Sequence, residues 1–472
     1  MIKLNVLTEN DIEAIHESSL RILAETGIVL IHPQGREILA ATGATVESDR
    51  VLLPPELVEE AIARCPNEVR LRGRGGMVKV LGDGSLRWHN LGGARDVYEP
   101  VSGTRRKALL QDLRDSTRLL DALDQVDSIT PFFTPQDVPG AIMSLAMYRY
   151  ALPHTTKVLQ GPGVQSAAEV RYTARMATVV GPPEEVVSLS VSPVSPLGFP
   201  NDAVEAILET ARLNITFGPL PCPTAGATAP LSLAGALAQQ NAEVLAAVVL
   251  AQLAQPGLPI VYCGRLAMLE PRTGLSVWGG VELGLASAAT VQLGHRYGLP
   301  VNVYGFSTNS YTLDIQNGFE RALNAAIPAL AGADELSGIG EMGAGVSSCF
   351  AQMVCDNELA ASVRRLIRGF SADDDARAVD VIAAVMRGSR NFLGQKHTSR
   401  YLRAGEVYMT RLAERGSWDT WEAGGGQGLA ERAQAEAERL LREHQVPPLS
   451  DDQERELDAI LDEAQQVLIS RN

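Results

Sequence analysis

Aromatic side chains and cysteines are scarce in this sequence. Phe, Trp and Tyr together make up 5% of the 472 residues, and the five cysteines are scattered without a C-x-x-C pair. An odd, dispersed set of cysteines argues against a disulfide framework, and the N-terminus lacks the basic and apolar regions of a secretory signal. We therefore expect reduced thiols and a cytoplasmic protein.

An excess of basic residues is also missing. Asp and Glu number 56 against 41 Lys and Arg, which gives a net charge of −15 and an isoelectric point near 5.0. This balance disfavours nucleic acid or an anionic membrane as a partner, and it is compatible with a small cationic ligand. The longest apolar stretches are interrupted by Gln or Glu, so we expect no membrane span.

Sequence patterns of metal sites and activated nucleophiles are absent. None of the seven histidines forms an i, i+4 pair or an H-x-C cluster. We therefore expect no metal site, although three ligands could still converge from distant loops. No G-x-S-x-G elbow is present. Cys263 is the one thiol at the end of an expected strand, and a free cysteine in such a place is more often a small buried apolar residue than a nucleophile.

What the sequence does have is a regular alternation of short β-branched or aromatic runs with apolar helical periods. The alternation begins at Leu86 and ends at Gly369, and it gives eight strand–helix units. This predicts an α/β protein with a (β/α)8 TIM barrel over residues 83–370. Residues 1–82 are expected to form a cap of helices and a hairpin, and residues 371–472 a C-terminal helical extension. Because several strands rest on three or four residues, a doubly wound open sheet stays an alternative.

Gly338, Gly340 and Gly343 form a G-x-G-x-x-G pattern between an expected strand and an expected helix. The pattern is that of a dinucleotide-binding loop, but it falls in the last unit of the series, where no second strand of a cofactor-binding βαβ unit follows. Two alternatives stay open. One is a close approach of backbone at a crowded barrel mouth, and the other is a phosphate-binding loop after the last strands of a barrel.

Candidate ligand-binding residues lie at the ends of the expected strands, where the loops of a barrel carry its active site. Aromatic residues there could hold a quaternary ammonium group, which has no N–H to donate and binds through the ring quadrupole. About half of these aromatic residues are expected to fill the barrel core instead. Glu341 could supply a nearby anion. Arg265 could bind a carboxylate through two hydrogen bonds, or form a surface ion pair instead. His89 ends the first expected strand. The aromatic residues at these positions are Trp88, Phe132, Phe133, Tyr262, Phe306 and Tyr311, and the site candidates among them are Phe133, Tyr262, Phe306 and Tyr311.

A longer pattern runs from Gly305 to Glu320, with the form G-x-S-x-x-S-x-x-x-D-x-Q-x-G-x-E. It resembles the trimethylamine methyltransferase family. Further segments resemble the same family in order and spacing, so the resemblance covers most of residues 90–425. These segments are GGARDVYEPVSGTRRKALLQDL, GATAPLSLAGALAQQNAEVLA, QLAQPGLPIVY, FLGQKHTSRYLRAGEVY and GSWDTWEAGG.

The resemblance implies a barrel enzyme that moves a methyl group from a methylamine to cob(I)alamin on a separate corrinoid protein, with no tightly bound cofactor of its own. Founding members carry pyrrolysine at the barrel mouth. This sequence has no such residue, and its counterpart is expected near Tyr311. An ordinary residue there resembles the members that act on quaternary amines such as glycine betaine, because a quaternary nitrogen is already a leaving group.

Under this hypothesis Tyr311, Glu341 and Asn309 are the catalytic candidates. Ser307 and Gln316 are expected to position the substrate, together with the aromatic residues, Arg265 and His89. We expect a homo-oligomer. Two rival functions stay open: a non-catalytic osmolyte-binding barrel, and a barrel methyltransferase that uses a folate.

Overall fold

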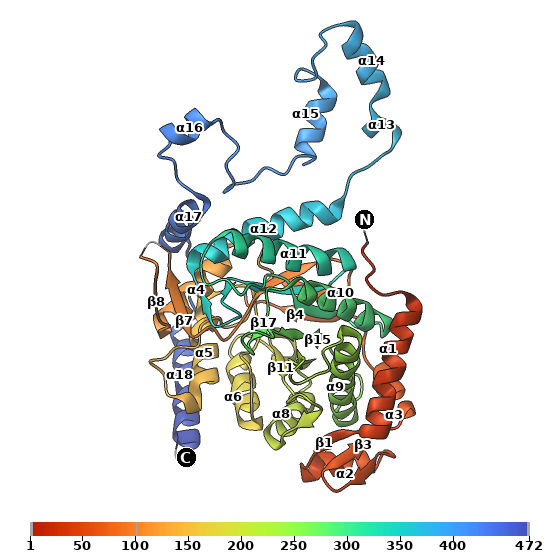
Figure 1. Ribbon diagram of the computed structural model, residues 1–472. Coiled ribbons are helices and arrows are strands. Elements are labelled where there is room, and N and C mark those ends of the chain that lie inside the picture. The colour runs from red at the N-terminus through yellow and green to blue at the C-terminus, as the bar shows by residue number, and fades with distance from the viewer. Residues whose placement is uncertain (1–2, 101, 470–472) are drawn as a thin grey trace.

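The computed structural model describes residues 3–100 and 102–469, and its body is a closed barrel of eight parallel strands. Helices surround these strands (Figure 1). In chain order the barrel strands are β6 (Arg87–Asn90), β9 (Ser128–Ile129), β10 (Val158–Leu159), β11 (Ser188–Val191), β13 (Thr216–Pro219), β15 (Tyr262–Gly264), β18 (Val301–Tyr304) and β19 (Glu335–Ile339). Six of them are paired in the order β10-β9-β6-β19-β18-β15, and β11 pairs in parallel with β13.

Two further contacts close the ring. The Gly161 N–H donates to the Ser188 carbonyl at 2.8 Å, which joins the end of β10 to β11. A parallel bridge between Phe217 and Ile260 joins β13 to the segment before β15. The predicted (β/α)8 barrel is therefore confirmed, and the open doubly wound sheet is excluded.

A helix follows each barrel strand and covers the outside of the ring. These helices are α4 (Leu110–Ala122), α5 (Met143–Ala151), α6 (Ala167–Thr178), α8 (Asn201–Arg212), α9 (Leu233–Ala254), α10 (Val281–Arg296), α11 (Ile315–Ala331) and α12 (Phe350–Arg368). Polar side chains begin several of them: Ser166 caps α6, and Asp314 caps α11. Because each helix runs back beside its strand, all loops that follow a strand meet at one end, the C-terminal mouth of the barrel.

One described helix, α9, is long and apolar enough to cross a membrane. Most of its residues are buried in this structure, where it packs against α8, α10 and the N-terminal helices α1 (Glu9–Arg21) and α3 (Pro55–Ala63). Here α9 serves as a core helix.

The N-terminal segment contains the expected helices and hairpin. β4 (Val69–Arg72) and β5 (Val78–Leu81) form the hairpin, and Val69, Leu71 and Leu81 pack against barrel residues. The hairpin covers the N-terminal end of the barrel, because Lys79 reaches the first residue of β9 and of β19. The sequence did not reveal α2 (Pro33–Ala40) or a small sheet of β1 (Ile28–Leu30), β2 (Thr45–Glu47), β3 (Arg50–Leu52) and β12 (Gly198–Phe199). The division at residues 82 and 370 stays a prediction.

Short strands stiffen the loops at the C-terminal mouth. One sheet contains β7 (Asp96–Glu99), β8 (Thr104–Lys107), β20 (Glu341–Met342) and β21 (Ser347–Ser348), and another contains β14 (Thr224–Ala225), β16 (Ala267–Leu269) and β17 (Ser276–Val277). Short helical pieces lie at Ile22–Thr26, Gly140–Ile142 and Leu152–His154, and α7 spans Pro183–Val186.

The G-x-G-x-x-G glycines allow backbone to pack closely at this mouth. Gly338 has φ 109°, and a Cβ there would lie 2.6 Å from the Phe306 carbonyl oxygen. A Cβ on Gly343 (φ 56°) would lie 2.6 Å from the Tyr311 ring. At Gly338 the obstacle is the backbone itself, so only glycine fits there, and the geometry favours the close-approach interpretation of the pattern.

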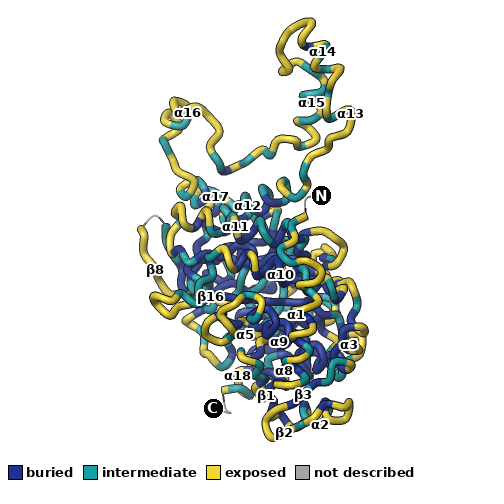
Figure 2. The backbone as a smooth tube through the Cα atoms, turned by 45° about the vertical axis from the view of Figure 1, so that its right-hand side comes forward, coloured by how far each residue is buried: buried dark blue, intermediate teal, exposed yellow. Residues whose placement is uncertain are grey.

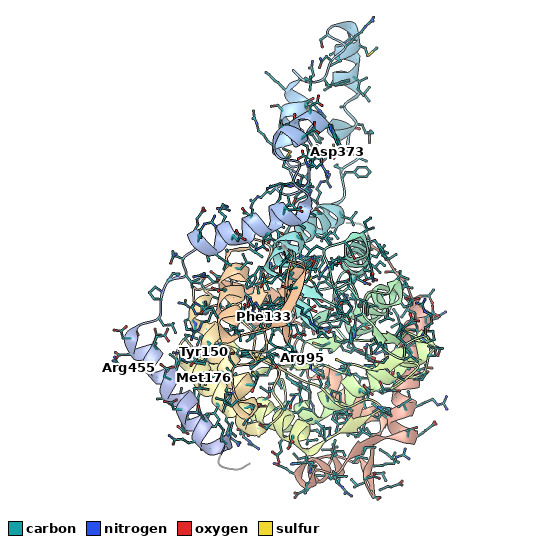
Figure 3. The ribbon with its side chains drawn as sticks, turned by 60° about the vertical axis from the view of Figure 1, so that its left-hand side comes forward. Arg95, Phe133, Tyr150, Met176, Asp373 and Arg455 are labelled. Atoms are coloured by element: carbon teal, nitrogen blue, oxygen red, sulfur yellow. The ribbon has the colours of Figure 1, made fainter. Side chains whose placement is uncertain are left out.

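Beyond α12 the chain leaves the body as an arm, defined here as residues 371–427 (Figures 1 and 2). The arm carries α13 (Asp374–Arg377), α14 (Val379–Arg387), α15 (Lys396–Arg403) and α16 (Trp418–Ala423). Figure 3 labels Asp373 on this arm, away from the body that contains Phe133. The chain then returns as α17 (Leu429–Glu443), which packs on α12, and α18 (Asp451–Ile469), which packs on α5 and α6.

The arm differs from its prediction in two places. The helix expected over 375–386 is interrupted at Ala378, which has φ 54°. The segment NFLGQKHTSRYLRAGE, expected as a loop, contains α15. Its apolar residues are too few and too widely spaced to give a helical period, so the pattern was too weak to predict a helix.

Candidate active site

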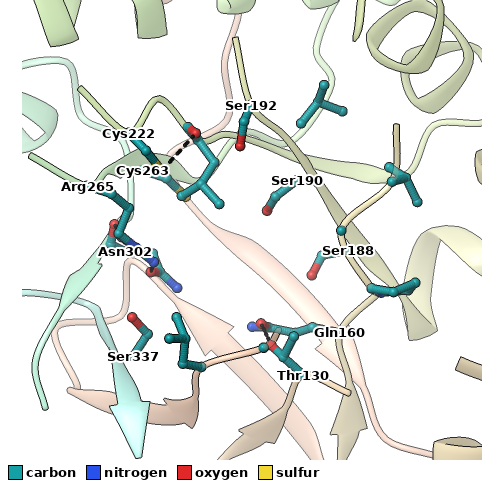
Figure 4. Close-up of a pocket in the computed structure, with 18 of the residues that line it drawn as sticks. Thr130, Gln160, Ser188, Ser190, Ser192, Cys222, Cys263, Arg265, Asn302 and Ser337 are labelled. Atoms are coloured by element: carbon teal, nitrogen blue, oxygen red, sulfur yellow. Dashed lines mark hydrogen bonds between the residues drawn. The ribbon is translucent and has the colours of Figure 1, made fainter. Parts of the chain in front are cut away.

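A cavity of about 490 Å³ lies on the barrel axis at the C-terminal mouth, and every barrel strand or the loop after it contributes to its wall. Figure 4 shows side chains from many of these strands pointing into one common space. Polar side chains line much of the wall. They include His89, Thr130, Gln160, Ser188, Ser190, Arg265, Asn302, Tyr304 and Ser337.

These polar residues occupy alternate positions on their strands. Cys263 and Arg265 are two residues apart, as are Asn302 and Tyr304, and both pairs line the cavity. Side chains two apart on a strand point to the same face, here the inside of the barrel. Barrel interiors are usually filled by branched apolar residues. The polar filling here therefore indicates a site rather than a packed core.

A buried ion pair lies below the cavity. The Lys79 ammonium lies 2.6 Å from Glu335 Oε1 and donates to Ser128 Oγ at 3.0 Å, and both charged side chains are 1% exposed. Burial acts to raise the pKa of Glu335, but the charge of Lys79 and the surrounding donors lower it to about 2. Glu335 is therefore a fixed anion on the barrel axis.

Asn302 connects this ion pair to the cavity. Its Nδ2 donates to Glu335 Oε2 at 2.6 Å and to His89 Nε2 at 2.9 Å, so His89 Nε2 acts as an acceptor. Burial lowers the pKa of His89 to about 4, and the ring is neutral at pH 7. Its proton then sits on Nδ1, which faces Thr130 Oγ1 at 3.4 Å.

Arg265 forms the inner wall of the cavity and is 5% exposed. Its Nη1 donates to the carbonyl oxygens of Asn302 at 2.8 Å and Gly264 at 3.1 Å, and its Nη2 donates to Asn302 Oδ1. The guanidinium carbon lies 4.6 Å from the centre of the Tyr304 ring. These contacts hold the guanidinium in one orientation.

The structure brings two of the predicted site residues, His89 and Arg265, to the cavity wall. Tyr311 is 60% exposed and lies outside the wall. Gln316 is exposed and donates to Glu320 at 2.9 Å. Asn309 Oδ1 accepts from the backbone N–H groups of residues 278 and 279, each at 2.7 Å, which ties two mouth loops together. The predicted roles of Tyr311, Gln316 and Asn309 stay predictions.

Ser307 and Glu341 form a buried pair outside the cavity wall. Ser307 Oγ donates to Glu341 Oε2 at 3.0 Å, and Glu341 is 2% exposed. Burial raises the pKa of Glu341 to about 8, against the lowering influence of Arg321 and Ser307. Burial therefore disfavours the anionic form of Glu341 that the sequence suggested, and the predicted roles of Ser307 and Glu341 stay predictions.

The predicted aromatic cage does not line the cavity. Tyr262, Phe306 and Phe133 are all fully buried and outside its wall. The Tyr262 hydroxyl donates to Asn241 on α9 at 2.7 Å, and Phe306 stacks on Trp88 with ring centres 4.6 Å apart.

The alternation of side chains along a strand explains why Tyr262, predicted to bind the substrate, does not line the cavity. Tyr262 is one position away from Cys263, so it faces the helices while Cys263 faces the barrel interior. Phe133 packs between Phe132 and Phe350. Among the described residues, the tyrosine that lines the cavity is Tyr304, which the sequence did not predict as a site residue.

Several residues of the site were missed from the sequence. Asn302, Glu335 and Gln160 could have been found as polar residues at inward positions of apolar strands. Asp202 lies in the first turn of α8 and gave no separate signal. Burial raises the pKa of the Cys263 thiol to about 12, in keeping with a buried apolar residue rather than a nucleophile. Among the described residues, no group of three His, Cys, Asp or Glu side chains could hold a metal ion.

Comparisons with known proteins agree over nearly the whole chain. The family model for trimethylamine methyltransferase matches residues 1–467. A trimethylamine methyltransferase MttB of Desulfitobacterium hafniense (strain DSM 10664 / DCB-2) is 31% identical over 422 residues, which cover 88% of this chain and 84% of the relative. A glycine betaine methyltransferase of Desulfitobacterium hafniense (strain Y51) is 29% identical over 468 residues, which cover 97% of both chains.

A solved structure shows the same fold. The monomethylamine methyltransferase MtmB of Methanosarcina barkeri superposes with a TM-score of 0.55 at 13% identity, over 93% of this chain and 89% of that one. At this identity the likeness concerns the fold alone. The sequence comparisons confirm the resemblance first seen between Gly305 and Glu320.

Proposed function

Since this chain belongs to the trimethylamine methyltransferase family, we propose that it takes a methyl group from a quaternary amine resembling glycine betaine and passes it to cob(I)alamin on a partner corrinoid protein. The observation that carries the proposal is the family match over residues 1–467, joined to one polar cavity at the end of the barrel where such enzymes act.

The reaction requires little from the protein except that it positions the substrate. In the transfer the bond between nitrogen and the departing methyl breaks, nitrogen keeps the electron pair as a tertiary amine, and the methyl carbon bonds to cobalt(I). The wall of the cavity holds one small amine and excludes water from it. Orientation of this kind supplies up to about 7–11 kcal/mol in favourable reactions.

In this proposal the methyl acceptor belongs to the partner protein, and this chain binds no cofactor of its own tightly. The reaction takes place in the cytoplasm, in keeping with the five free cysteines. Nucleic acid and membrane surfaces are not partners of this acidic chain.

We also propose that the chain forms a homo-oligomer through its arm. Residues 371–427 expose large apolar side chains, among them Leu393 at 85%, Met409 at 71% and Val379 at 66%. The arm contains eight Asp or Glu and eight Lys or Arg and is neutral, whereas the whole chain carries −15. A neutral, apolar arm fits the acidic body of a second copy without like-charge repulsion.

Sedimentation velocity tests the arm. The 50.5 kDa chain should sediment as an oligomer, and the double variant Leu393→Ser/Met409→Ser should shift toward monomer. Leu275→Ser is the matched control, because Leu275 is 66% exposed on the body. A monomeric wild-type chain would contradict the proposal.

The methyl-transfer proposal is tested by the cobalt spectrum. Purified protein, glycine betaine and free cob(I)alamin, or a corrinoid protein, should give the absorption of methylcobalamin. Ser190→Phe should abolish this change, because Ser190 points into the cavity (Figure 4). Tight betaine binding without any spectral change would favour the osmolyte binder. Methylation of tetrahydrofolate without cobalt would favour the folate enzyme.

A further inference from the structure

The cavity wall carries two charged side chains, Arg265 and Asp202, because burial lowers the pKa of the His89 ring and favours its neutral form. They differ in depth. Arg265 is 5% exposed and lies at the inner wall, whereas Asp202 is exposed. The cavity therefore has a positive inner end and a negative rim.

Arg265 stands apart from the other buried cations. The buried basic side chains of the described chain are Lys79, Arg149, Arg265 and Arg321. Lys79 pairs with Glu335, Arg149 with Glu454 and Asp458, and Arg321 with Asp356. Within the described residues, no carboxylate lies within 4.0 Å of Arg265, and its three hydrogen bonds all end on neutral oxygens.

An unpaired buried guanidinium on a cavity wall indicates an anionic ligand. Burying a charge without a counter-charge is unfavourable, so buried charges are normally paired. Arg265 has five N–H groups, and its hydrogen bonds use three of them. The other two are the donors that a carboxylate would need, and the Tyr304 ring and Asn302 already hold the guanidinium plane.

Asp202 supplies the opposite charge at the rim. It is the second residue of α8, where the helix dipole favours a negative charge. It forms no ion pair with any described residue, although it lines the same cavity. An ammonium group near the rim would therefore meet a free carboxylate.

We propose that the cavity recognises a zwitterionic betaine by both ends, with the carboxylate on Arg265 and the methylated nitrogen on the side of Asp202. This inference rests on the proposed function and narrows its substrate to amines that carry a carboxylate. Because Arg265 is the deep group, the N-methyl groups face the mouth, where a methyl acceptor can reach them. Specificity comes from two charges rather than from an aromatic cage.

Calorimetric binding with three probes tests this arrangement without any corrinoid. Glycine betaine carries both charges, choline lacks the carboxylate, and 3,3-dimethylbutanoate has the same shape as glycine betaine but no positive charge. The wild-type protein should bind glycine betaine most tightly. Arg265→Gln should weaken glycine betaine and 3,3-dimethylbutanoate by about 30-fold or more, and choline by much less.

Asp202→Asn should give the reverse pattern with a smaller effect. It should weaken glycine betaine and choline about 2- to 5-fold, because Asp202 is exposed, and leave 3,3-dimethylbutanoate unchanged. Glu282→Gln is the matched control, because Glu282 is the second residue of α10, is exposed, and lies outside the cavity wall. This control should bind all three probes like the wild type.

Two results would overturn the inference: equal wild-type affinity for choline and glycine betaine, or an Arg265→Gln variant that weakens all three probes alike. A general folding defect is distinguished by circular dichroism of the same samples. In the cobalt assay Arg265→Gln should raise KM more than it lowers kcat. The larger proposal fails separately, if glycine betaine binds as described but no methylated amine yields methylcobalamin.

Discussion

Glu335 and Glu341 are two buried glutamates six residues apart, and their environments drive them to opposite charge states. Both are at most 2% exposed. The pKa of Glu335 falls to about 2, and that of Glu341 rises to about 8. The difference lies in their neighbours, because Glu335 has the Lys79 ammonium at 2.6 Å, whereas Glu341 has the Ser307 hydroxyl and no cation within 4.0 Å in the described chain.

The comparison shows that burial alone does not set the charge of this barrel interior. Burial raises the pKa of both carboxyls, and a partner 256 residues away in sequence reverses the result for one. The N-terminal hairpin is therefore part of the site's electrostatics. Through Glu335 and Asn302 it fixes the proton of His89 and the orientation of Arg265.

Breaking the Lys79–Glu335 pair should have the largest effect. Lys79→Met leaves a buried carboxylate without a counter-charge, and we expect a loss of about 3–5 kcal/mol in the free energy of unfolding. Urea denaturation followed by tryptophan fluorescence and far-UV circular dichroism measures this loss.

The double variant Lys79→Met/Glu335→Gln is the control for that loss. Gln at position 335 keeps an oxygen for Asn302 Nδ2, so the double variant should recover most of the stability. A single variant as stable as the wild type would show that Lys79 does not determine the charge of Glu335, and the contrast with Glu341 would lose its cause.

The sequence predicted the barrel because its signal is local. Each strand–helix unit carries its own change of period, and even the two-residue strand β9 was marked by its flanking helices. The sequence also predicted that Arg265 and His89 lie at the mouth, because the position of a residue at a strand end can be predicted without knowledge of distant contacts. It could not decide whether Arg265 binds a carboxylate ligand or forms a surface ion pair, because the burial of Arg265 depends on how the strands close into a ring.

Long-range pairing is what the sequence could not supply. Nothing in the hairpin VRLRGRGGMVKVLG marks Lys79 as the partner of Glu335, because that contact depends on the hairpin packing under the barrel. The prediction that Tyr262 lines the cavity was wrong by one strand position. In a strand, a shift of one position moves a side chain from the inside of the barrel to the outside. Asn302 and Glu335 occupy strand positions that face the barrel interior, but the sequence prediction favoured neighbouring aromatic residues instead.

The pH dependence of stability tests the difference between Glu341 and Glu335 through a smaller effect than the loss of the Lys79–Glu335 pair. The unfolded Glu341 carboxyl titrates near 4.5 and the folded one near 8, so between these values the folded protein holds a proton that the unfolded chain has released. This contribution to the free energy of unfolding is complete below pH 4.5 and is lost as the pH rises toward 8. Gln at position 341 is neutral in both the folded and the unfolded state, so Glu341→Gln should abolish this decline and flatten the pH profile by on the order of 3 kcal/mol between pH 5 and pH 8. Urea titrations at several pH values measure the slope, and an unchanged slope in Glu341→Gln would mean that Glu341 is ionised in the folded protein.

Glu335 should contribute the opposite slope in a different range. Its folded pKa of about 2 lies below the unfolded value of 4.5, so its stabilisation is present above pH 4.5 and is lost as the pH falls toward 2. The Lys79→Met/Glu335→Gln variant should therefore lose less stability than the wild type on acidification from pH 5 to pH 3. Equal acid sensitivity of the two proteins would argue against an ionised Glu335.

The smallest expected effect is that of Glu341→Gln at pH 5, where the two glutamates differ most sharply. At this pH the folded Glu341 carboxyl is protonated, and a Gln amide has nearly the same size and still offers an oxygen to the Ser307 hydroxyl. We expect a change within about 0.5 kcal/mol in the free energy of unfolding, the range of a substitution that removes no buried interaction. Glu335→Gln under the same conditions leaves the Lys79 ammonium unpaired and should be far more destabilising. If the two Gln variants were destabilised equally at pH 5, burial rather than the partner would decide the energetics of both positions.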